Sequence, residues 1–163
     1  MEGNLPDRQD AANQSRTSAG EALSRLVVLA FRLDGALTAV GDALARPAGQ
    51  TSARWRVLAA VETAPMSVAE IARAWSLARQ SVQRVADELE RDGLTRYEEH
   101  PGDRRTKLVT LTPAGAAALR KIQTAQRAWA NELGAQVDAD DLVRAGEILE
   151  RILEAPAMRR DLG

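Results

Sequence analysis

Three cationic side chains and one acid surround a Pro-Gly turn in the stretch HPGDRRTKLVTLTPAG, residues 100–115. Arg104, Arg105 and Lys107 carry the positive charges, and Asp103 stands beside them. Guanidinium and ammonium groups bind phosphate and carboxylate oxygens, so this cluster suits an anionic partner. The alternative is a solvated turn, which is the usual place of a charge run.

The rest of the chain contains few residues that are suited to catalysis or to metal binding. The 163 residues include no cysteine, which excludes disulfides, thiolate nucleophiles, thiol redox sensing and cysteine-based zinc sites. His100 is the single histidine, so the chain offers neither a histidine cluster for a metal nor a nucleophile with a histidine base. The acidic residues lie mostly at expected helix surfaces and caps. We therefore expect that the protein is not an enzyme and that it binds neither a cofactor nor a metal ion.

The composition favours a helical protein. Apolar residues make up 45% of the chain and aromatic residues only 3%, so the core must be built mainly from Ala, Leu and Val. No apolar run approaches the ~20 residues of a membrane span, and the start MEGNLPDRQD does not resemble a signal peptide. We therefore expect a soluble, cytoplasmic protein. Because the net charge is -1, contact with a polyanion must come from a local patch of charge.

A long helix with two apolar faces is expected near the N-terminus. Residues 1–18 are polar and are expected to form a disordered tail, and Ser18 and Glu21 have capping-box spacing at the start of a helix over 19–46. One seam, with spacings of three and four, comprises Leu26, Ala30, Leu33, Leu37, Val40 and Leu44; the second face comprises Val28, Leu29 and Phe31. Two faces need two partners. Either these are its own domain and a second chain, or the helix is the central core helix of a monomer.

A helix-turn-helix pattern follows. Thr51 or Ser52 caps a first helix, and the capping-box pair Ser67 and Glu70 starts a short second one. The stretch RQSVQRVADELERDG forms the third, with Gly93 as its C-cap. The expected inward residues are Trp55, Leu58 and Val61, then Val68, Ile71, Ala72 and Trp75, then Val82, Val85, Ala86 and Leu89. Two short helices joined by a tight turn are typical of a helix-turn-helix, although many helical proteins contain such a pair.

Two β-prone runs after this helix pair make the pattern more specific. LTRYEE and KLVTLT contain Tyr, Thr, Val and Leu and are separated by HPGDRRT, so they predict a hairpin with the cations at its tip. A helix-turn-helix followed by such a hairpin is a winged helix. Its second helix enters the major groove of DNA, and its hairpin reaches the neighbouring minor groove and phosphates. We therefore predict a DNA-binding domain over residues 51–112.

Two further helices are expected after the hairpin. Thr112 caps the first, with Pro113 at its first position, and Asp138 caps the second. The apolar residues of the second helix again repeat at three and four: Leu142, Ala145, Leu149 and Ile152. The predicted fold class is mainly α with a small β-hairpin, in which a winged helix-turn-helix domain is flanked by N- and C-terminal helices.

The stretch DRRTKLVTLTPAG resembles the wing signature of the MarR (multiple antibiotic resistance regulator) family of transcription factors. That signature is Asp-x-Arg, three residues, and then an apolar residue followed by x-Leu-Thr-x-x-Gly. The matching residues are Asp103, Arg105, Val109, Leu111, Thr112 and Gly115, with Val109 where Leu is usual. SVAEIARAWSLARQSVQRVADELERDGLTRYEE is similar to the family's helix-turn-helix, and the order of elements agrees over residues 20–155. Ala78 departs from the pattern, because Ser or Thr usually caps the recognition helix there, and Ser76 is the alternative cap.

The resemblance implies a homodimer in which the first helix and the helices of residues 113–155 act as dimerisation helices of two interleaved chains. The two recognition helices would then read a pseudo-palindromic DNA operator with half-sites ~34 Å apart. Members of the family are often repressors that a small aromatic or anionic effector releases, so we expect a ligand-responsive repressor; the choice between repressor and activator stays open. Phe31, Arg54 and Trp55 are candidates for the effector site, or else core and surface residues.

The residues expected to contact DNA lie on the second helix of the pair and on the wing. They are Arg79, Gln80, Ser81, Gln83, Arg84, Arg96, Asp103, Arg104, Arg105 and Lys107. On a helical wheel Gln80, Arg84 and Asp87 point outward, and Gln and Arg pair bidentately with adenine and guanine. Asp87 and Glu88 face away from phosphate or hold an arginine in its rotamer. Arg96, on the first wing strand, is a phosphate candidate.

Some of the wing residues are expected to contact the minor groove, and others the phosphates. Asp103 holds the guanidinium of Arg105, which enters a narrow minor groove, while Arg104 and Lys107 meet the flanking phosphates. The alternative function is a protein-protein adaptor built on a winged helix. Such an adaptor is expected to lack the outward Arg84 and the arginine pair of the wing.

Overall fold

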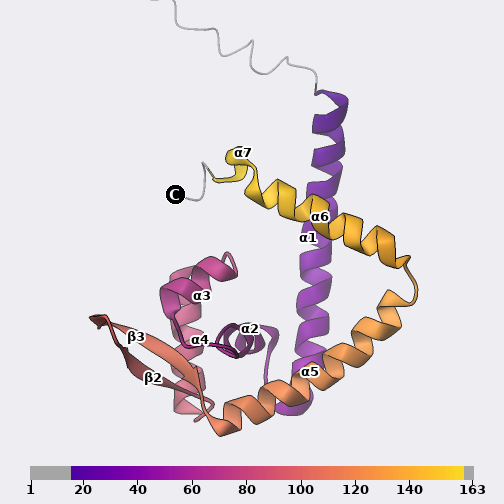
Figure 1. Ribbon diagram of the computed structural model, residues 1–163. Helices are drawn as coiled ribbons and strands as arrows, with labels where there is room; N and C mark the ends of the chain where they lie inside the picture. The colour runs from indigo at the N-terminus through magenta and orange to yellow at the C-terminus, as the bar shows by residue number, and fades with distance from the viewer. Residues whose placement is uncertain (1–15, 160–163) are drawn as a thin grey trace, which may run out of the picture. The chain divides into compact units, whose positions relative to one another are not determined.

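The computed structural model describes residues 16–159 and is mainly helical (Figure 1). The helices are α1 (Ser18–Ala45), the 3-10 helix η2 (Arg46–Ala48), α2 (Ser52–Ala60), α3 (Val68–Ala74), α4 (Arg79–Arg91), α5 (Pro113–Gly134), α6 (Ala139–Glu154) and α7 (Pro156–Arg159), and the strands are β1 (Met66–Ser67), β2 (Thr95–His100) and β3 (Asp103–Leu111). The chain divides into two compact units at Gly41 and Asp42. The predicted fold class, mainly α around a winged helix-turn-helix, is confirmed. Of the tail predicted over residues 1–18, positions 1–15 lie outside the described residues.

Helix α1 is long, as predicted, but its cap is a different residue. The N–H of Gly20 donates to the Oγ1 of Thr17 at 3.1 Å, so Thr17 is the N-cap and the capping box predicted for Ser18 and Glu21 is wrong. The helix begins one residue earlier than predicted. Its exposed large apolar side chains are Leu23, Val27, Val28, Leu29, Phe31, Leu33 and Leu37, with Phe31 75% exposed.

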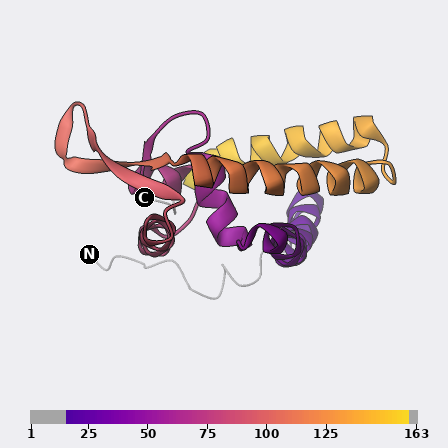
Figure 2. The same cartoon turned by 90° about the horizontal axis from the view of Figure 1, so that it is seen from below.

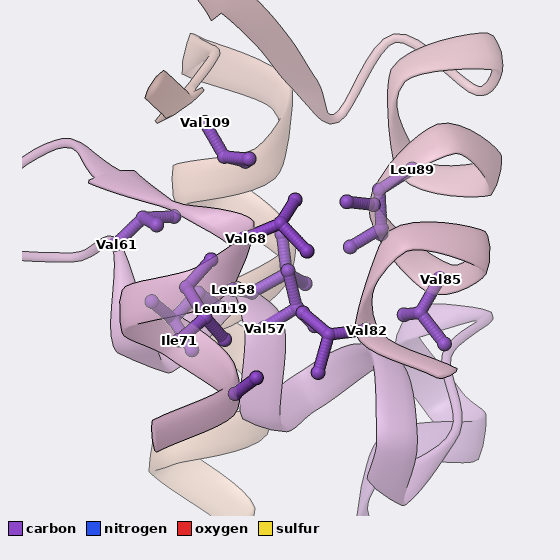
Figure 3. Close-up of a cluster of buried hydrophobic side chains, with 12 residues drawn as sticks. Val57, Leu58, Val61, Val68, Ile71, Val82, Val85, Leu89, Val109 and Leu119 are labelled. Carbon is purple, nitrogen blue, oxygen red and sulfur yellow. The ribbon is translucent and has the colours of Figure 1, made fainter. Parts of the chain in front are cut away.

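The core of the second unit lies between α2, α3, α4, β3 and α5 (Figure 3). Leu58, Ile71, Leu89 and Leu119 are fully buried there. The predicted stripe of α4, Val82, Val85, Ala86 and Leu89, is buried along its whole length. Trp55 is half-buried against this core.

Trp75 does not face the core as predicted, because it is 43% exposed. Helix α3 ends at Ala74, and Trp75 is its C-cap with φ -106° and ψ 7°. The next residue, Ser76, has a φ of 50° in the left-handed region. The chain therefore leaves the helix before the side chain of Trp75 can continue the inward stripe of Val68, Ile71 and Ala72.

Local hydrogen bonds define the helix ends that the sequence predicts. Thr51 accepts from the N–H of Arg54 at the start of α2. Ser67 and Glu70 form the predicted capping box of α3, with the Ser67 N–H 2.7 Å from Glu70 Oε2. Gly93, with a φ of 72°, follows α4 in a Schellman motif: its N–H donates to the Glu90 carbonyl at 2.9 Å.

The sheet has three antiparallel strands in the order β1-β3-β2. Strand β1 was not predicted, because it is only two residues long and pairs Met66 and Ser67 with the middle of β3. Strands β2 and β3 keep one register from Thr95–Leu111 to Glu99–Lys107, and it then shifts so that His100 pairs with Asp103. The three residues 104–106 of β3 therefore form a bulge, and the turn itself is only Pro101 and Gly102.

Thr112 and Gly115 join the hairpin to α5. Thr112 Oγ1 accepts from the N–H of Gly115 at 3.1 Å and donates to the carbonyl of Gly93 at 2.7 Å. A Cβ on Gly115 would lie 1.9 Å from the carbonyl oxygen of Leu94, so only glycine permits this approach. The hairpin and α5 leave this joint in opposite directions (Figure 2).

Helix α6 is capped by Asp138 as predicted, and it contains no buried residue. Its exposed large apolar side chains are Leu142, Val143, Ile148, Leu149 and Leu153. None of the helices between residues 16 and 159 combines the length and apolarity that a membrane span requires.

Candidate nucleic-acid interface

The burial of one stripe of α4 leaves the opposite face of the helix in solvent. Arg79, Gln80, Ser81, Gln83 and Arg84 are all exposed on it. The predicted outward direction of Gln80 and Arg84 agrees with this arrangement. Asp87, also predicted to point outward, is instead half-buried, because it turns toward β2.

Arg84 is held by an acid one turn later on the same helix. Its Nη1 lies 2.6 Å from Glu88 Oε1, and its side chain is still 68% exposed. Exposed i,i+4 ion pairs contribute only about 0.3–0.5 kcal/mol, so the guanidinium is easily released to a stronger partner. Glu88 thus restricts the rotamers of Arg84, one of the two roles predicted for it.

The first turn of α4 carries no side-chain cap. Ala78 is the N-cap residue with extended backbone angles, and no side chain accepts from the first turn. Ser76 therefore does not replace the missing Ser or Thr. The N–H groups of this turn stay without the side-chain oxygen that a usual cap supplies, on the side where the exposed Arg79 and Gln80 stand.

A hydrogen-bonded triangle links α4 to the first wing strand. Gln83 Nε2 donates to Asp87 Oδ1 at 2.7 Å and to Tyr97 Oη at 2.8 Å, and Tyr97 Oη donates to the same Asp87 oxygen at 2.7 Å. Burial, and then this hydrogen bond to Asp87, raise the pKa of the Tyr97 phenol far above its ordinary value. Tyr97 is not among the predicted site residues, because its place in a β-prone run is its only signal in the sequence.

Asp103 organises the wing tip differently from the prediction. Its Oδ1 accepts from the backbone N–H of Arg105 at 2.9 Å, and its Oδ2 accepts from Thr106 Oγ1 at 2.7 Å. The hydrogen bond from Thr106 and then that from Arg105 lower the pKa of the Asp103 carboxyl below its usual range. No hydrogen bond or ion pair joins Asp103 to the guanidinium of Arg105 within the described part of the chain, so the predicted charge-assisted hydrogen bond between these two side chains is wrong. The bulge turns the Arg105 backbone, rather than its side chain, toward the acid.

The wing cations are exposed, and they differ in their partners. Arg104 and Arg105 are exposed, and across residues 16–159 neither guanidinium enters an ion pair. Lys107 Nζ lies 6.0 Å from the centre of the Tyr97 ring, at the outer limit of a cation-π contact. Arg96 pairs with Glu98 at 2.6 Å on the other face of the hairpin.

A groove of about 750 Å³ runs between α3, α4 and the hairpin. Arg79 and Gln83 of α4 line it together with Arg105 and Lys107 of the hairpin. The groove also contains acids, among them Asp87. Part of the predicted DNA-contacting set thus lies around one groove, whereas Arg96 lies on the outer face of the sheet.

The three effector candidates have separate environments. Arg54 forms an ion pair with Asp92 at 2.5 Å, which joins the start of α2 to the end of α4, and its side chain is only 16% exposed. Trp55 packs against the core, and Phe31 belongs to the first unit, on α1. Structural roles therefore account for Arg54 and Trp55, and an effector site stays a prediction.

Comparison with known proteins agrees with this arrangement. The model of the MarR family matches residues 48–106. The uncharacterized protein Rv2011c of Mycobacterium tuberculosis is 33% identical over 135 residues, 83% of this chain and 94% of that protein. The transcriptional activatory protein BadR of Rhodopseudomonas palustris is 26% identical over 155 residues, 92% of this chain and 89% of BadR. The crystal structure of the M. tuberculosis transcriptional regulator MOSR with DNA has a TM-score of 0.65 at 29% identity and covers 78% of this chain and 95% of MOSR.

The fold and the exposed face of α4 beside a cationic hairpin define a winged helix-turn-helix DNA-binding protein. With a 33% identical relative spanning most of the chain and a matching family model, the chain belongs to the MarR family of transcription regulators.

Proposed function

We propose that the protein is a homodimeric, ligand-responsive repressor that binds a pseudo-palindromic operator. Each subunit places α4 in the major groove of one half-site and its hairpin at the adjacent minor groove. The observation that carries this proposal is the exposed polar face of α4, with Gln80 and Arg84, on the same domain as the exposed arginines of the wing, Arg104 and Arg105.

The side chains of α4 are suited to base edges. Gln80 offers a donor and an acceptor for adenine, and Arg84 offers two parallel donors for guanine once it leaves Glu88. Ser81 and Arg79 flank them near the uncapped helix start, where free N–H groups and the helix dipole favour a phosphate.

The wing supplies a local patch of positive charge, although the chain as a whole is nearly neutral. Arg105 enters a narrow minor groove, where the negative potential is strongest. Arg104, Lys107 and Arg96 meet phosphates, and Arg96 leaves its exposed pair with Glu98 to do so. Asp103 contributes by shaping the backbone from which Arg105 projects.

A second copy of the chain is the proposed partner of the apolar faces on α1 and α6. Large exposed apolar patches on a soluble chain mark interaction surfaces. Leu33 and Leu37 on α1 are 54% and 42% exposed, and Leu142 and Leu149 on α6 are 48% and 42% exposed. Residues 19–46 and 113–155 would then be the dimerisation helices, with residues 51–112 as the DNA-binding domain between them.

Regulation by a small aromatic or anionic effector is proposed from membership of the family. Phe31, Arg54 and Trp55 are the candidate residues, although Arg54 would have to leave Asp92. BadR carries the name of an activatory protein, whereas repression follows where the operator overlaps a promoter. A promoter fusion, with and without the protein, decides the sign for this chain.

A gel shift with the DNA upstream of the protein's own gene tests operator binding. The full chain is expected to shift this fragment at low and at moderate salt, and to shift a scrambled fragment of equal length only at low salt. Arg84→Ala should lose the difference between the two fragments. Arg127→Ala, an exposed arginine on α5, should keep it. Equal affinity of the full chain for both fragments would favour the adaptor function instead.

A further inference from the structure

The amide of Gln83 differs from that of Gln80 in being tied to two neighbours. Its Nε2 donates to Asp87 Oδ1 at 2.7 Å and to Tyr97 Oη at 2.8 Å. Gln83 and Asp87 lie one turn apart on α4, and Tyr97 comes from the middle of β2. Within residues 16–159, Gln80 has no such hydrogen bond. The side-chain amides of these two glutamines, on one exposed helix face, therefore differ in their freedom to rotate.

The chemistry of the triangle determines which end of the Gln83 amide is free. A carboxylate only accepts hydrogen bonds, so the part of the amide that faces Asp87 must be its NH₂ group. The hydroxyl of Tyr97 uses its own hydrogen on Asp87 and accepts the second amide hydrogen of Gln83. The phenol of Tyr97 is protonated at neutral pH, and the environment raises its pKa further above the ordinary value. The NH₂ end of the Gln83 amide is thus turned toward Asp87 and Tyr97, and Oε1 is the end that faces away from them.

We propose that Asp87 and Tyr97 fix the amide of Gln83 so that this side chain reads DNA only as an acceptor. It then selects adenine or cytosine, whose exocyclic amines are the donors in the major groove, and it disfavours guanine and thymine, which present acceptors. A freely rotating glutamine offers both a donor and an acceptor and reads adenine bidentately. Asp87 and Tyr97 are positioning residues in this scheme. The inference rests on the proposed binding of α4 in the major groove.

Selection from a randomised operator library by the full-length protein, followed by sequencing, measures the preference at each position. One position in each half-site should prefer adenine or cytosine in the wild type, and Gln83→Ala should remove that preference alone. Tyr97→Phe keeps the ring and frees one N–H of Gln83. At that position it should lower the ratio of adenine and cytosine to guanine and thymine by about fivefold, the value of one hydrogen bond.

Gln80→Ala identifies a second position and serves as the matched control, because Tyr97→Phe should leave the preference there unchanged. If Tyr97→Phe weakens binding to every sequence equally, the triangle only tethers the wing to α4 and the inference is wrong. The inference is also wrong if Gln83→Ala leaves every preference intact while the wild type still selects a site. If the wild type selects no site at all, the proposed function fails and the inference falls with it.

Discussion

The carboxylate of Asp103 accepts a hydrogen bond from the backbone N–H of Arg105 at 2.9 Å, so the acid shapes the chain at the wing tip. The same carboxylate accepts from Thr106 Oγ1 at 2.7 Å. It therefore holds the bulge from which the cations project, and it does so without neutralising them. An acid beside a proposed DNA contact has a structural reason to be there.

Asp103→Ala should weaken operator binding by about fivefold, because the backbone loses one hydrogen bond that orders Arg105. Simple electrostatics predicts the reverse, since the change removes a negative charge. Asp103→Asn keeps an acceptor oxygen for the N–H of Arg105 and should retain most of the affinity. Fluorescence anisotropy with labelled operator at several salt concentrations measures both variants. Tighter binding by Asp103→Ala at every salt concentration would refute the role of Asp103.

Arg105→Ala should weaken operator binding and reduce its dependence on salt. If Arg105 neutralises one phosphate, the slope of log K against log salt becomes shallower by about 0.9. The fold should be intact, because the side chain is exposed at the bulge. Arg127→Ala removes an equal charge from α5 and should change neither quantity. An affinity for Arg105→Ala within the error of the wild type would exclude Arg105 from the interface.

Gly115→Ala should destabilise the protein by about 2 kcal/mol or more, because overpacking against backbone forces the elements apart. The added Cβ would lie 1.9 Å from the carbonyl oxygen of Leu94. Gly134→Ala, at the other end of α5, meets nothing within 4 Å and should be neutral or slightly stabilising. Urea unfolding followed by circular dichroism compares the two. Equal stabilities would mean that α5 can move away from Leu94 without loss.

Thr95→Val should raise the free energy of unfolding by about 1 kcal/mol, because a buried unsatisfied hydroxyl is replaced by a methyl group of the same shape. Thr95 is 2% exposed, and its Oγ1 has no hydrogen-bond partner among the residues that the structure describes. Thr112→Val is the matched change at a hydroxyl that bonds both Gly93 and Gly115, and it should lower stability. The same unfolding measurement checks both. A destabilised Thr95→Val would indicate a water molecule bound to this hydroxyl.

Leu33→Asp with Leu37→Asp should give monomeric or unfolded protein in analytical ultracentrifugation, because two charges would enter the proposed dimer seam. The control is Arg25→Asp with Arg32→Asp, which adds the same acids at exposed polar positions of α1 and should leave the dimer intact. A folded monomer that still binds the operator with wild-type affinity would disprove the homodimer.

Features that depend on neighbouring residues in the chain could be predicted from the sequence. The Ser67–Glu70 box, the Thr112 cap and the Asp138 cap all follow from spacing, and all three are present. The buried stripe of α4 follows from its period, because Val82 and Leu89 lie two turns apart on one face.

Features that depend on pairing between distant segments could not be predicted. Strand β1 exists only because Met66 meets Val109 of β3, and two residues carry no periodicity of their own. The bulge that directs the Asp103 carboxylate to the backbone of Arg105 arises from the register of β2 against β3. The role of Tyr97 likewise depends on a contact with Asp87 ten residues away. The apolar period predicts Trp75 inward because a period does not show where its helix ends.

The bulge at residues 104–106 has a consequence for how such wings can change during evolution. Val109, at the root of the hairpin, pairs with both Met66 and Tyr97 and is 1% exposed, so a shift of one residue there would turn core side chains into solvent. Beyond the Glu99–Lys107 pair the register already shifts, because His100 pairs with Asp103. Insertions, deletions and changes of charge at the tip therefore leave the packing of the core unchanged. The wing of this fold can therefore change in length or charge to suit a different operator while the buried pairing at Val109 is kept.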